Sequence, residues 1–346
     1  MSQKIDVVVV GATGAVGEAM LEILEEREFP VGELYVLASE RSAGKTIRAF
    51  GKTYQVEDLA TFDFSKAQVG LFSPGGAVSA QYAPVAAEAG CWVIDNTSHF
   101  RLDPQVPLVV PEVNGHVLDG YDGRIIANPN CSTIQMLVAL KPLHDAVGIT
   151  RINVATYQAV SGAGAKGVAE LAGQTAALLN GRDYAPEQFA TQIAFNAIPQ
   201  IGEFDANGYS TEEMKMVWET QKIFEDDQIL VNPTCVRIPV FYGHSEVIHL
   251  ELAASLSVAG ARELLGRANG VTLIDENALS EGVETPYPTP VKEASGSDSV
   301  FVGRLRSDLS HPNGLNLWVV SDNVRKGAAL NSVQIAELLL ANGTLM

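Results

Sequence analysis

One cysteine stands where the sequence changes from a strand pattern to a helix pattern. Residues 124–127 are typical of a strand and residues 134–146 of a helix, and the run Asn128-Pro129-Asn130-Cys131-Ser132-Thr133 joins them. A thiol at a helix N-terminus meets unpaired N–H groups and the positive end of the helix dipole, which favour a nucleophilic thiolate. The alternative is a small buried thiol, the commoner state of intracellular cysteines. Position alone leaves both interpretations open.

A second run could bind an anion and move a proton. Arg237 is a fixed cation in an otherwise apolar strand pattern over residues 235–241, and its forked donors fit a carboxylate. His244 follows the glycine turn at Gly243 and could act as acid or base near neutral pH. Alone, each has an ordinary interpretation, as an ion-pair partner or as a surface or core histidine. Beside a candidate nucleophile, they favour covalent catalysis on an anionic substrate.

The N-terminus carries a glycine-rich turn between a strand and a helix. Strand-like residues 5–10 lead into Gly11-Ala12-Thr13-Gly14-Ala15-Val16-Gly17, and residues 18–27 are helical in pattern. This order predicts a dinucleotide site, although the spacing is G-x-x-G-x-x-G where G-x-G-x-x-G is usual. Gly11 and Gly14 are therefore expected cofactor contacts.

The residues after the second strand, residues 33–38, should determine whether the cofactor is NAD or NADP. An acidic residue there favours NAD and an arginine favours NADP, and both Glu40 and Arg41 are present. Arg41, Ser42 and Lys45 favour NADP. Ser39 begins this turn and is an expected contact.

Further strand patterns at residues 69–72, 92–94, 108–110 and 124–127 predict an α/β fold, a Rossmann-type doubly wound parallel sheet. The turn after residue 72 contains Ser73, Gly75 and Gly76, at the carboxyl edge where ligands bind. Cys131 follows the last strand and should face the same edge.

From about residue 132 the pattern changes to that of an α+β domain. Strands are expected at residues 152–160, 235–241 and 246–253, and helices at 166–179 and 211–224. Long loops are expected at 180–210 and 281–298, and an amphipathic helix at 324–340 could pack back onto the first domain. The predicted domains are residues 1–131, completed by about 324–346, and residues 132–323.

Composition excludes several classes of protein. The chain has 346 residues, of which 47% are hydrophobic and 18% charged, as in soluble globular proteins. A net charge of −18 argues against nucleic acid and anionic membranes as partners but not against an anionic substrate. No apolar stretch could span a bilayer, no signal peptide is evident, and three cysteines are too few for a disulfide framework or zinc site. We therefore expect a cytoplasmic protein without a metal.

Six runs together resemble the aspartate-β-semialdehyde dehydrogenase family and follow its order along nearly the whole chain. They are residues 11–17, 128–131, 158–164 (Gln-Ala-Val-Ser-Gly-Ala-Gly), 212–215 (Glu-Glu-Met-Lys), 237–244 and 322–329 (Asp-Asn-Val-Arg-Lys-Gly-Ala-Ala). The resemblance implies a glyceraldehyde-3-phosphate dehydrogenase-like second domain, NADP as cofactor, and a homodimer formed through that domain.

The resemblance also implies roles for individual residues. Cys131 would be the nucleophile that forms a thioester, His244 the acid/base and Gln158 a substrate-orienting residue. Arg237 would hold the substrate α-carboxylate and Glu212 its amino group. Inorganic phosphate would be bound by Arg101, Asn130 and Lys215, and NADP by Thr13, Gly14, Ala15, Val16, Arg41, Ser42, Ser161, Gly162 and Asn323. Without the resemblance, Glu212 and Lys215 would be an ordinary i,i+3 ion pair, and Arg101 a surface residue.

The implied reaction is the NADPH-dependent reductive dephosphorylation of L-aspartyl 4-phosphate to L-aspartate 4-semialdehyde, in lysine, threonine, methionine and isoleucine biosynthesis. A Cys131 thiolate would attack the acyl phosphate, and the thioester would accept hydride from NADPH. His244 would protonate the developing oxyanion and later deprotonate the thiohemiacetal.

Two alternatives are kept. The first is a related reductase, of the N-acetyl-glutamyl-phosphate or glyceraldehyde-phosphate type, which fits the Asn-Pro-Asn-Cys and Gly-His-Ser-Glu runs less well. The second is a non-catalytic paralogue that acts as a binding or assembly subunit. Such a paralogue should have lost at least one of Cys131, Gln158, Arg237 and His244, and all four are present.

Overall fold

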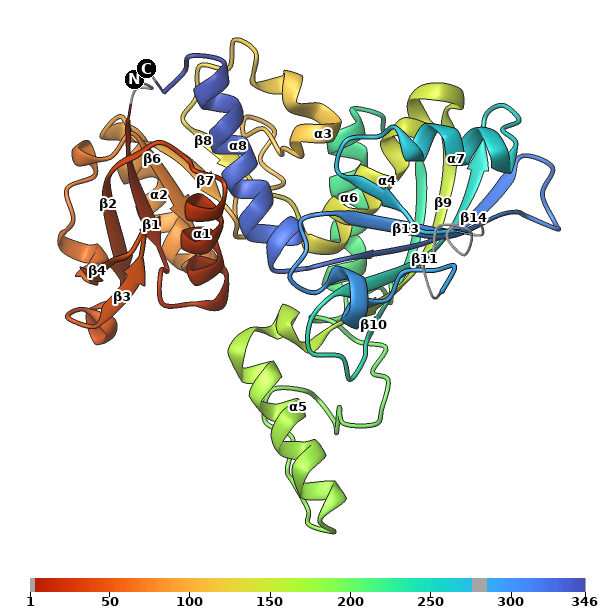
Figure 1. The fold of residues 1–346 in the computed structure, drawn as a ribbon, viewed down its shortest axis with the longest axis horizontal. Helices are drawn as coiled ribbons and strands as arrows, with labels where there is room; N and C mark the ends of the chain where they lie inside the picture. The colour runs from red at the N-terminus through yellow and green to blue at the C-terminus, as the bar shows by residue number, and fades with distance from the viewer. Residues whose placement is uncertain (1–3, 276–284, 346) are drawn as a thin grey trace. The chain divides into compact units, whose positions relative to one another are not determined.

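The computed structural model describes residues 4–275 and 285–345 (Figure 1). The chain forms two compact units, Met1–Pro129 with Ala328–Met346, and Asn130–Gly327.

The first unit is built on a parallel sheet of six strands in the order β5-β2-β1-β6-β7-β8. Mostly apolar runs form the central strands of this sheet, because both of its faces are covered there. The strands are β1 (Ile5–Val10), β2 (Val31–Ala38), β5 (Glu57–Asp58), β6 (Val69–Phe72), β7 (Trp92–Asp95) and β8 (Ile125–Ala127), with a separate hairpin of β3 (Thr46–Ala49) and β4 (Lys52–Gln55). The strand order reverses between β1 and β6, the point where doubly wound sheets bind ligands.

Helices cover both faces of this sheet. Helices α1 (Ala15–Glu26) and α8 (Leu330–Ala341) lie side by side, and Arg27 Nε and Nη2 donate to the two oxygens of Glu337 at 2.7 Å each (Figure 1). Helix α2 (Gly76–Glu88) packs Ala83 and Ala86 into a cluster that includes Phe72. The C-terminal segment therefore completes the first unit.

Three predicted elements of the first unit differ in detail. Residues 108–110 are not a strand: only Leu108 makes a bridge, to Ala127, and Pro111 then begins helix α3 (Pro111–Asn114). Proline is favoured at that first helical position, which ends any strand there. Helix α1 begins at Ala15, earlier than expected. The helix expected at 324–340 starts only at Leu330, after a π-helical turn over Arg325–Ala329.

The second unit contains a mixed sheet of six strands in the order β10-β9-β11-β14-β13-β12. The strands are β9 (Ile149–Gln158), β10 (Leu230–Arg237), β11 (His244–Leu252), β12 (Val271–Leu273), β13 (Val300–Ser307) and β14 (Gly314–Ser321). Helices α4 (Cys131–Val147), α6 (Thr211–Phe224) and α7 (Val258–Gly266) pack against it. Helix α5 (Gly164–Leu179) packs against the loop over residues 180–210, and the contact is a hydrophobic cluster that contains Leu171 and Ile193.

These observations confirm the fold class, a doubly wound parallel sheet followed by an α+β unit. The strand expected over 235–241 instead ends at Arg237, and β9 ends at Gln158, two residues before the predicted end. Residues 180–210 form a loop, as predicted. Of the loop expected at 281–298, residues 281–284 lie outside the described residues, and Pro290–Ala294 forms a π-helical turn. No helix in the described ranges has the length and apolar character needed to cross a membrane.

Candidate active site

Cys131 is the first residue of helix α4 and is half-buried. Asn130 caps the helix: its Oδ1 accepts hydrogen bonds from Ser132 N at 3.0 Å and Thr133 N at 3.3 Å. The backbone N–H of Asn130 donates to Glu219 Oε2 at 2.6 Å, which anchors the turn to helix α6. The thiol therefore lies at a capped helix N-terminus, where the helix dipole favours a thiolate.

His244, the first residue of β11, is fully buried, and its two ring nitrogens have different neighbours. Nδ1 accepts a hydrogen bond from Ala159 N at 3.0 Å, and Nε2 lies 3.4 Å from Gln158 Nε2. Because Nδ1 is an acceptor, the proton of the neutral ring belongs on Nε2. Burial and the charge of Arg237 lower the pKa of His244 to about 3, against the opposing effect of Glu212. His244 is therefore neutral at physiological pH and presents an Nε2–H donor.

Glu212 links the helix cap to the strand that carries Gln158. Its Oε1 accepts from Asn130 Nδ2 at 2.8 Å and Gln158 Nε2 at 3.1 Å, and its Oε2 accepts from Lys215 Nζ at 3.1 Å. Burial alone would raise the pKa of Glu212, but the Lys215 charge and these hydrogen bonds outweigh it and lower the pKa to about 2. Glu212 is thus a buried anion, and the i,i+3 pair with Lys215 also exists.

Arg237 ends strand β10 and is buried. Its Nη1 donates to Ala159 O at 2.6 Å, and its backbone exchanges hydrogen bonds with Ile198 at 2.8 and 2.9 Å. Burial lowers the pKa of Arg237, while the charges of Glu212 and of a Cys131 thiolate act to raise it. Arg237 also lines a cavity of about 350 Å³, and the loop over residues 180–210 forms most of the remaining wall. It is therefore a buried cation beside open space.

Gly162 lies against both Arg237 and His244. A Cβ at position 162 would come within 2.8 Å of Arg237 Nη1 and 3.3 Å of His244 Nε2. The neighbouring Ser161 Oγ donates to Asn323 Oδ1 at 3.0 Å, and Gly243 N donates to the same oxygen at 3.0 Å. The structure thus brings Ser161, Gly162 and Asn323, three predicted cofactor contacts, to the side of the site that contains His244.

Alanine at position 162 is expected to lower kcat by about 10-fold or more, because the added methyl group displaces the guanidinium or the imidazole. Steady-state kinetics and thermal unfolding of Gly162→Ala measure the effect. Gly266→Ala is the matched control, since a Cβ at the end of helix α7 meets nothing within 4 Å. Equal kcat in the two variants would contradict the close packing around Gly162.

In the first unit, the glycine-rich turn is as tight as a dinucleotide site requires. Gly11 has φ +83°, and a Cβ there would lie 2.6 Å from Ser73 O, so only glycine fits between the ends of β1 and β6. A Cβ on Gly17 would lie 2.3 Å from Gly11 O. Glycine at position 17 therefore allows α1 to begin close to the turn. The first turn of α1 then leaves N–H groups for an anion.

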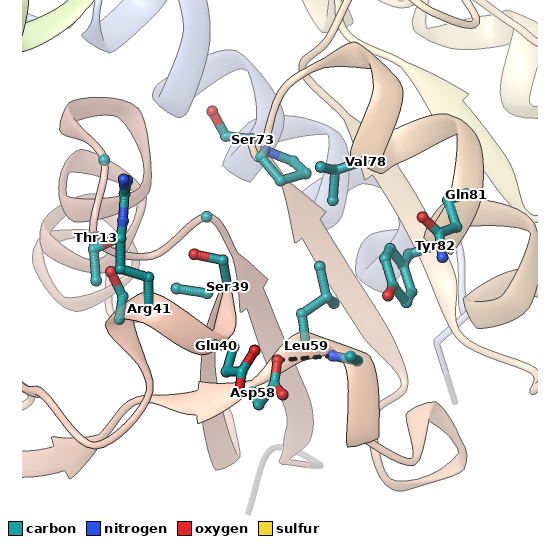
Figure 2. Close-up of a pocket in the computed structure, with 16 residues that line it drawn as sticks. Thr13, Ser39, Glu40, Arg41, Asp58, Leu59, Ser73, Val78, Gln81 and Tyr82 are labelled. Carbon is teal, nitrogen blue, oxygen red and sulfur yellow. Dashed lines mark hydrogen bonds between the residues drawn. The ribbon is translucent and has the colours of Figure 1, made fainter.

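A pocket of about 520 Å³ opens from this turn (Figure 2). Figure 2 shows Thr13 and Arg41 on one side of the pocket and Val78 and Tyr82 on the other. Of the predicted cofactor contacts, Gly11, Thr13, Gly14, Ser39, Arg41, Ser42 and Ser73 line it, whereas Ala15, Val16, Gly75 and Gly76 do not. Its volume and its place at the reversal of strand order fit the adenosine end of a dinucleotide.

Arg101, in the first unit, is held by backbone carbonyl groups. Its Nε donates to Asn128 O at 2.9 Å and its Nη2 to Asn96 O at 3.0 Å. The Asn128 side chain in turn donates to Asn96 Oδ1 and accepts from Asn331 Nδ2, both at 2.7 Å. Arg101 is therefore buried and oriented, which corrects its interpretation as a surface residue.

Sequence reasoning missed several residues of these sites. Thr156, whose Oγ1 donates to Gln158 Oε1 at 3.0 Å, lies two residues earlier on the same strand face. Glu219 lies two helical turns after Glu212, so helical spacing could have indicated it. Asp58, Leu59, Ala60, Val78, Gln81 and Tyr82 line the pocket, and no motif marks them. In the described ranges, no group of three or more His, Cys, Asp or Glu side chains could hold a metal ion.

Comparison with known proteins decides the family. A model of the semialdehyde dehydrogenase NAD binding domain matches residues 6–121, and one of the semialdehyde dehydrogenase dimerisation domain matches residues 140–326. The aspartate-semialdehyde dehydrogenase 2 of Vibrio cholerae is 61% identical over 341 residues, 98% of this chain and 99% of that protein. The chain belongs to the aspartate-semialdehyde dehydrogenase family. The resemblance found in the sequence motifs is thereby confirmed.

Other members of the aspartate-semialdehyde dehydrogenase family agree in sequence and structure. The Legionella pneumophila enzyme is 59% identical over 340 residues, covering 98% of this chain and 96% of that protein. The crystal structure of Vibrio cholerae aspartate semialdehyde dehydrogenase II complexed with ASA matches with a TM-score of 0.95 and 60% identity, over 98% of this chain and 99% of that one. The matched NAD binding domain contains every residue that lines the pocket of Figure 2.

Proposed function

We propose that this protein catalyses the reversible, NADPH-dependent reductive dephosphorylation of L-aspartyl 4-phosphate to L-aspartate 4-semialdehyde through a thioester on Cys131. The observation that carries the proposal is the buried cluster in the second unit, where ionised Glu212, Arg237 and neutral His244 are joined through Gln158 and Ala159. Such a set of one anion, one cation and one neutral donor suits an amino-acid substrate whose reacting carbonyl develops negative charge.

The substrate's amino-acid end determines its orientation. Arg237 binds the α-carboxylate, and Glu212, whose pKa is lowered to about 2, binds the α-ammonium group as a carboxylate. An N-acetylated glutamyl substrate lacks that positive charge and would leave the buried Glu212 charge without its ligand. The cluster therefore favours a free amino acid over the N-acetylated alternative.

In the first step, the Cys131 thiolate attacks the acyl carbon, and the bond from that carbon to the phosphate oxygen breaks. Lys215, Arg101 and the second N–H of the Asn130 amide are proposed to bind the departing phosphate. The Oδ1 of Asn130 is committed to the helix cap and one of its N–H groups to Glu212, so capping comes first among its roles. The overall reaction consumes one proton, and the departing phosphate takes it up.

In the second step, the thioester becomes a tetrahedral thiohemiacetal oxyanion, which collapses to the aldehyde and regenerates the Cys131 thiolate. NADPH, when bound, supplies the hydride for this step. The Nε2–H of His244 donates a hydrogen bond to the oxyanion, and no proton has to leave the ring, because collapse of the oxyanion returns its electrons to sulfur. This refines the expected acid/base role into oxyanion stabilisation.

We propose NADP as the cofactor because Arg41 faces the pocket of Figure 2 from beside Thr13. Arg41→Ala is expected to raise KM for NADPH by about 10-fold or more through loss of a charged contact to the 2′-phosphate. The smaller activity with NADH should change little. Arg48→Ala removes an exposed arginine outside the pocket and is the control. Equal losses with NADH and NADPH would contradict the assignment.

We further propose a cytoplasmic homodimer formed through the second unit, which acts in the biosynthesis of lysine, threonine, methionine and isoleucine. Tyr157 and Trp318, with ring centroids 5.9 Å apart, lie half-buried on one sheet face. The match to the dimerisation domain model over residues 140–326 supports this interface.

The direct test is oxidation of aspartate semialdehyde by purified protein with NADP and inorganic phosphate, followed by NADPH absorbance. We expect turnover that requires phosphate and exceeds turnover on N-acetyl-glutamate semialdehyde. Absence of turnover with a reactive Cys131 thiol would support a non-catalytic paralogue instead.

A further inference from the structure

Gln135 and Glu246 form a second pair of polar residues on the two elements that carry Cys131 and His244. Gln135 follows Cys131 by one turn of helix α4, and Glu246 follows His244 by two residues of β11. Residues four apart share a helix face, and residues two apart share a strand face. Gln135 Nε2 donates a hydrogen bond to the backbone carbonyl of His244 at 3.5 Å. This contact joins helix α4, which carries the proposed nucleophile, to strand β11, which carries the proposed oxyanion donor.

Both members of this pair are fully buried and incompletely satisfied. Within the described ranges, Gln135 Oε1 and both carboxyl oxygens of Glu246 have no hydrogen-bond partner. The Gln135 amide is close enough to Glu246 to lower its pKa. The two side chains do not, however, form a hydrogen bond of ordinary geometry. An ionised carboxylate without partners in such a place costs several kcal/mol.

In the part of the chain that the structure describes, the groups that shift the pKa of Glu246 are its buried surroundings and the Gln135 amide, and they include no cation. In the sheet register Glu246 lies opposite Thr156 on β9 and Val319 on β14. His244, two residues earlier on the same strand, is neutral, and the thiol of Cys235 on β10 has a pKa raised by burial and by the charge of Glu212. Burial therefore dominates and holds the pKa of Glu246 well above its usual value.

We infer that Glu246 is un-ionised, that its O–H donates to Gln135 Oε1, and that this acid–amide pair is a positioning device that holds helix α4 in register with His244. The inference rests on the proposed function of Cys131 and His244. One hydrogen bond satisfies two of the unpartnered groups, and it leaves Gln135 Nε2 on the carbonyl of His244. Neither residue touches substrate in this account.

The protonation state is tested without any activity measurement, by thermal unfolding of Glu246→Gln and wild type between about pH 5 and pH 8. A carboxyl group whose pKa is raised in the folded state stabilises the fold fully only below its unfolded pKa. That stability is lost as pH rises toward the folded pKa, because the unfolded chain ionises first. Glutamine has no such loss, so the Tm of Glu246→Gln should gain about 2 °C per pH unit relative to wild type over the range between the unfolded and the folded pKa of Glu246.

A Tm difference that stays flat or falls with pH would mean that Glu246 is ionised in the fold, and it would overturn the inference. An infrared band of an un-ionised carboxyl group at neutral pH, absent from Glu246→Gln, is the second measurement of the same state. Neither result depends on whether the protein reduces aspartyl phosphate, so failure here is distinguishable from failure of the proposed function.

The positioning role is tested by kinetics. Glu246→Gln can still donate to Gln135 and should keep kcat within about 2-fold of wild type, whereas Gln135→Leu and Glu246→Leu should lower kcat by about 10-fold or more. KM for NADP should be unchanged in all three, because neither residue lines the pocket of the first unit or is a predicted cofactor contact. The double variant Gln135→Leu/Glu246→Leu pairs two apolar groups and should fold, yet keep the low kcat. Wild-type kcat in that double variant would overturn the positioning role.

Discussion

Serine at position 131 is expected to lower kcat by at least about 10³-fold while the protein remains folded. Cys131 is half-buried at the first position of helix α4, and serine has nearly the same shape. The helix N-terminus, capped by Asn130, stabilises a thiolate but cannot ionise a hydroxyl group at physiological pH, because the hydroxyl pKa is far higher. An oxygen ester would also be a poorer hydride acceptor than a thioester.

Cys91→Ser is the matched control for this substitution. Burial raises the pKa of the Cys91 thiol to about 12, and its side chain belongs to the core of the first unit. Its replacement should lower thermal stability and leave kcat per folded molecule unchanged. A Cys131→Ser variant with more than a few per cent of wild-type turnover would contradict the covalent mechanism.

Leucine at position 237 is expected to raise KM for aspartate semialdehyde by about 10²-fold, since a charge-assisted pair with the α-carboxylate is lost from a buried site. The effect on KM for NADP should be small. Arg237 also contributes to the low pKa of His244, so the variant raises the pKa of His244 above about 3. Protonation at Nδ1 would break the hydrogen bond from Ala159 N that orients the ring, so activity on the acid side should begin to fall at a higher pH than in wild type.

Arg237→Lys separates charge from geometry. Lysine keeps the charge but loses the forked donors, so it should recover part of the substrate affinity and keep the acid side of the pH profile close to wild type. The measurements are KM for each substrate and a pH profile of kcat/KM. An unchanged KM for aspartate semialdehyde in Arg237→Leu would exclude Arg237 as the carboxylate ligand.

Much of the fold was predictable from local pattern. Strand β1, the glycine-rich turn and helix α6 follow from apolar runs, glycine spacing and a capping box at Ser210. Residues 108–110 were predicted wrongly because three apolar residues resemble a buried strand, although Pro111 beside them starts a helix. Likewise β10 stops at Arg237 because the backbone turns just after it, where Val240 N donates a hydrogen bond to Ile238 O.

Residue types predicted the members of the candidate site better than their states. The hydrogen bond from Ala159 N to His244 fixes the tautomer of the ring, and it comes from a backbone group just after β9, far from His244 in the sequence. The helix cap by Asn130 is a local feature that sequence can indicate. The hydrogen bond from Asn130 to Glu212 joins residues far apart in the sequence, so local pattern could not predict it. Glu246 looked like an ordinary strand residue, since its burial depends on the packing of α4 over the sheet.

The central claim, a thioester on Cys131, is tested most directly by trapping it. The enzyme is mixed with aspartate semialdehyde and NADP in the absence of phosphate, quenched in acid, and digested for mass spectrometry. We predict a burst of NADPH of one equivalent per active site and an aspartyl group on the peptide that contains Cys131. Added phosphate should discharge the aspartyl group as aspartyl phosphate and turn the burst into continuous NADPH formation. Steady oxidation without a burst, or an unmodified Cys131 peptide at the plateau, would contradict the mechanism.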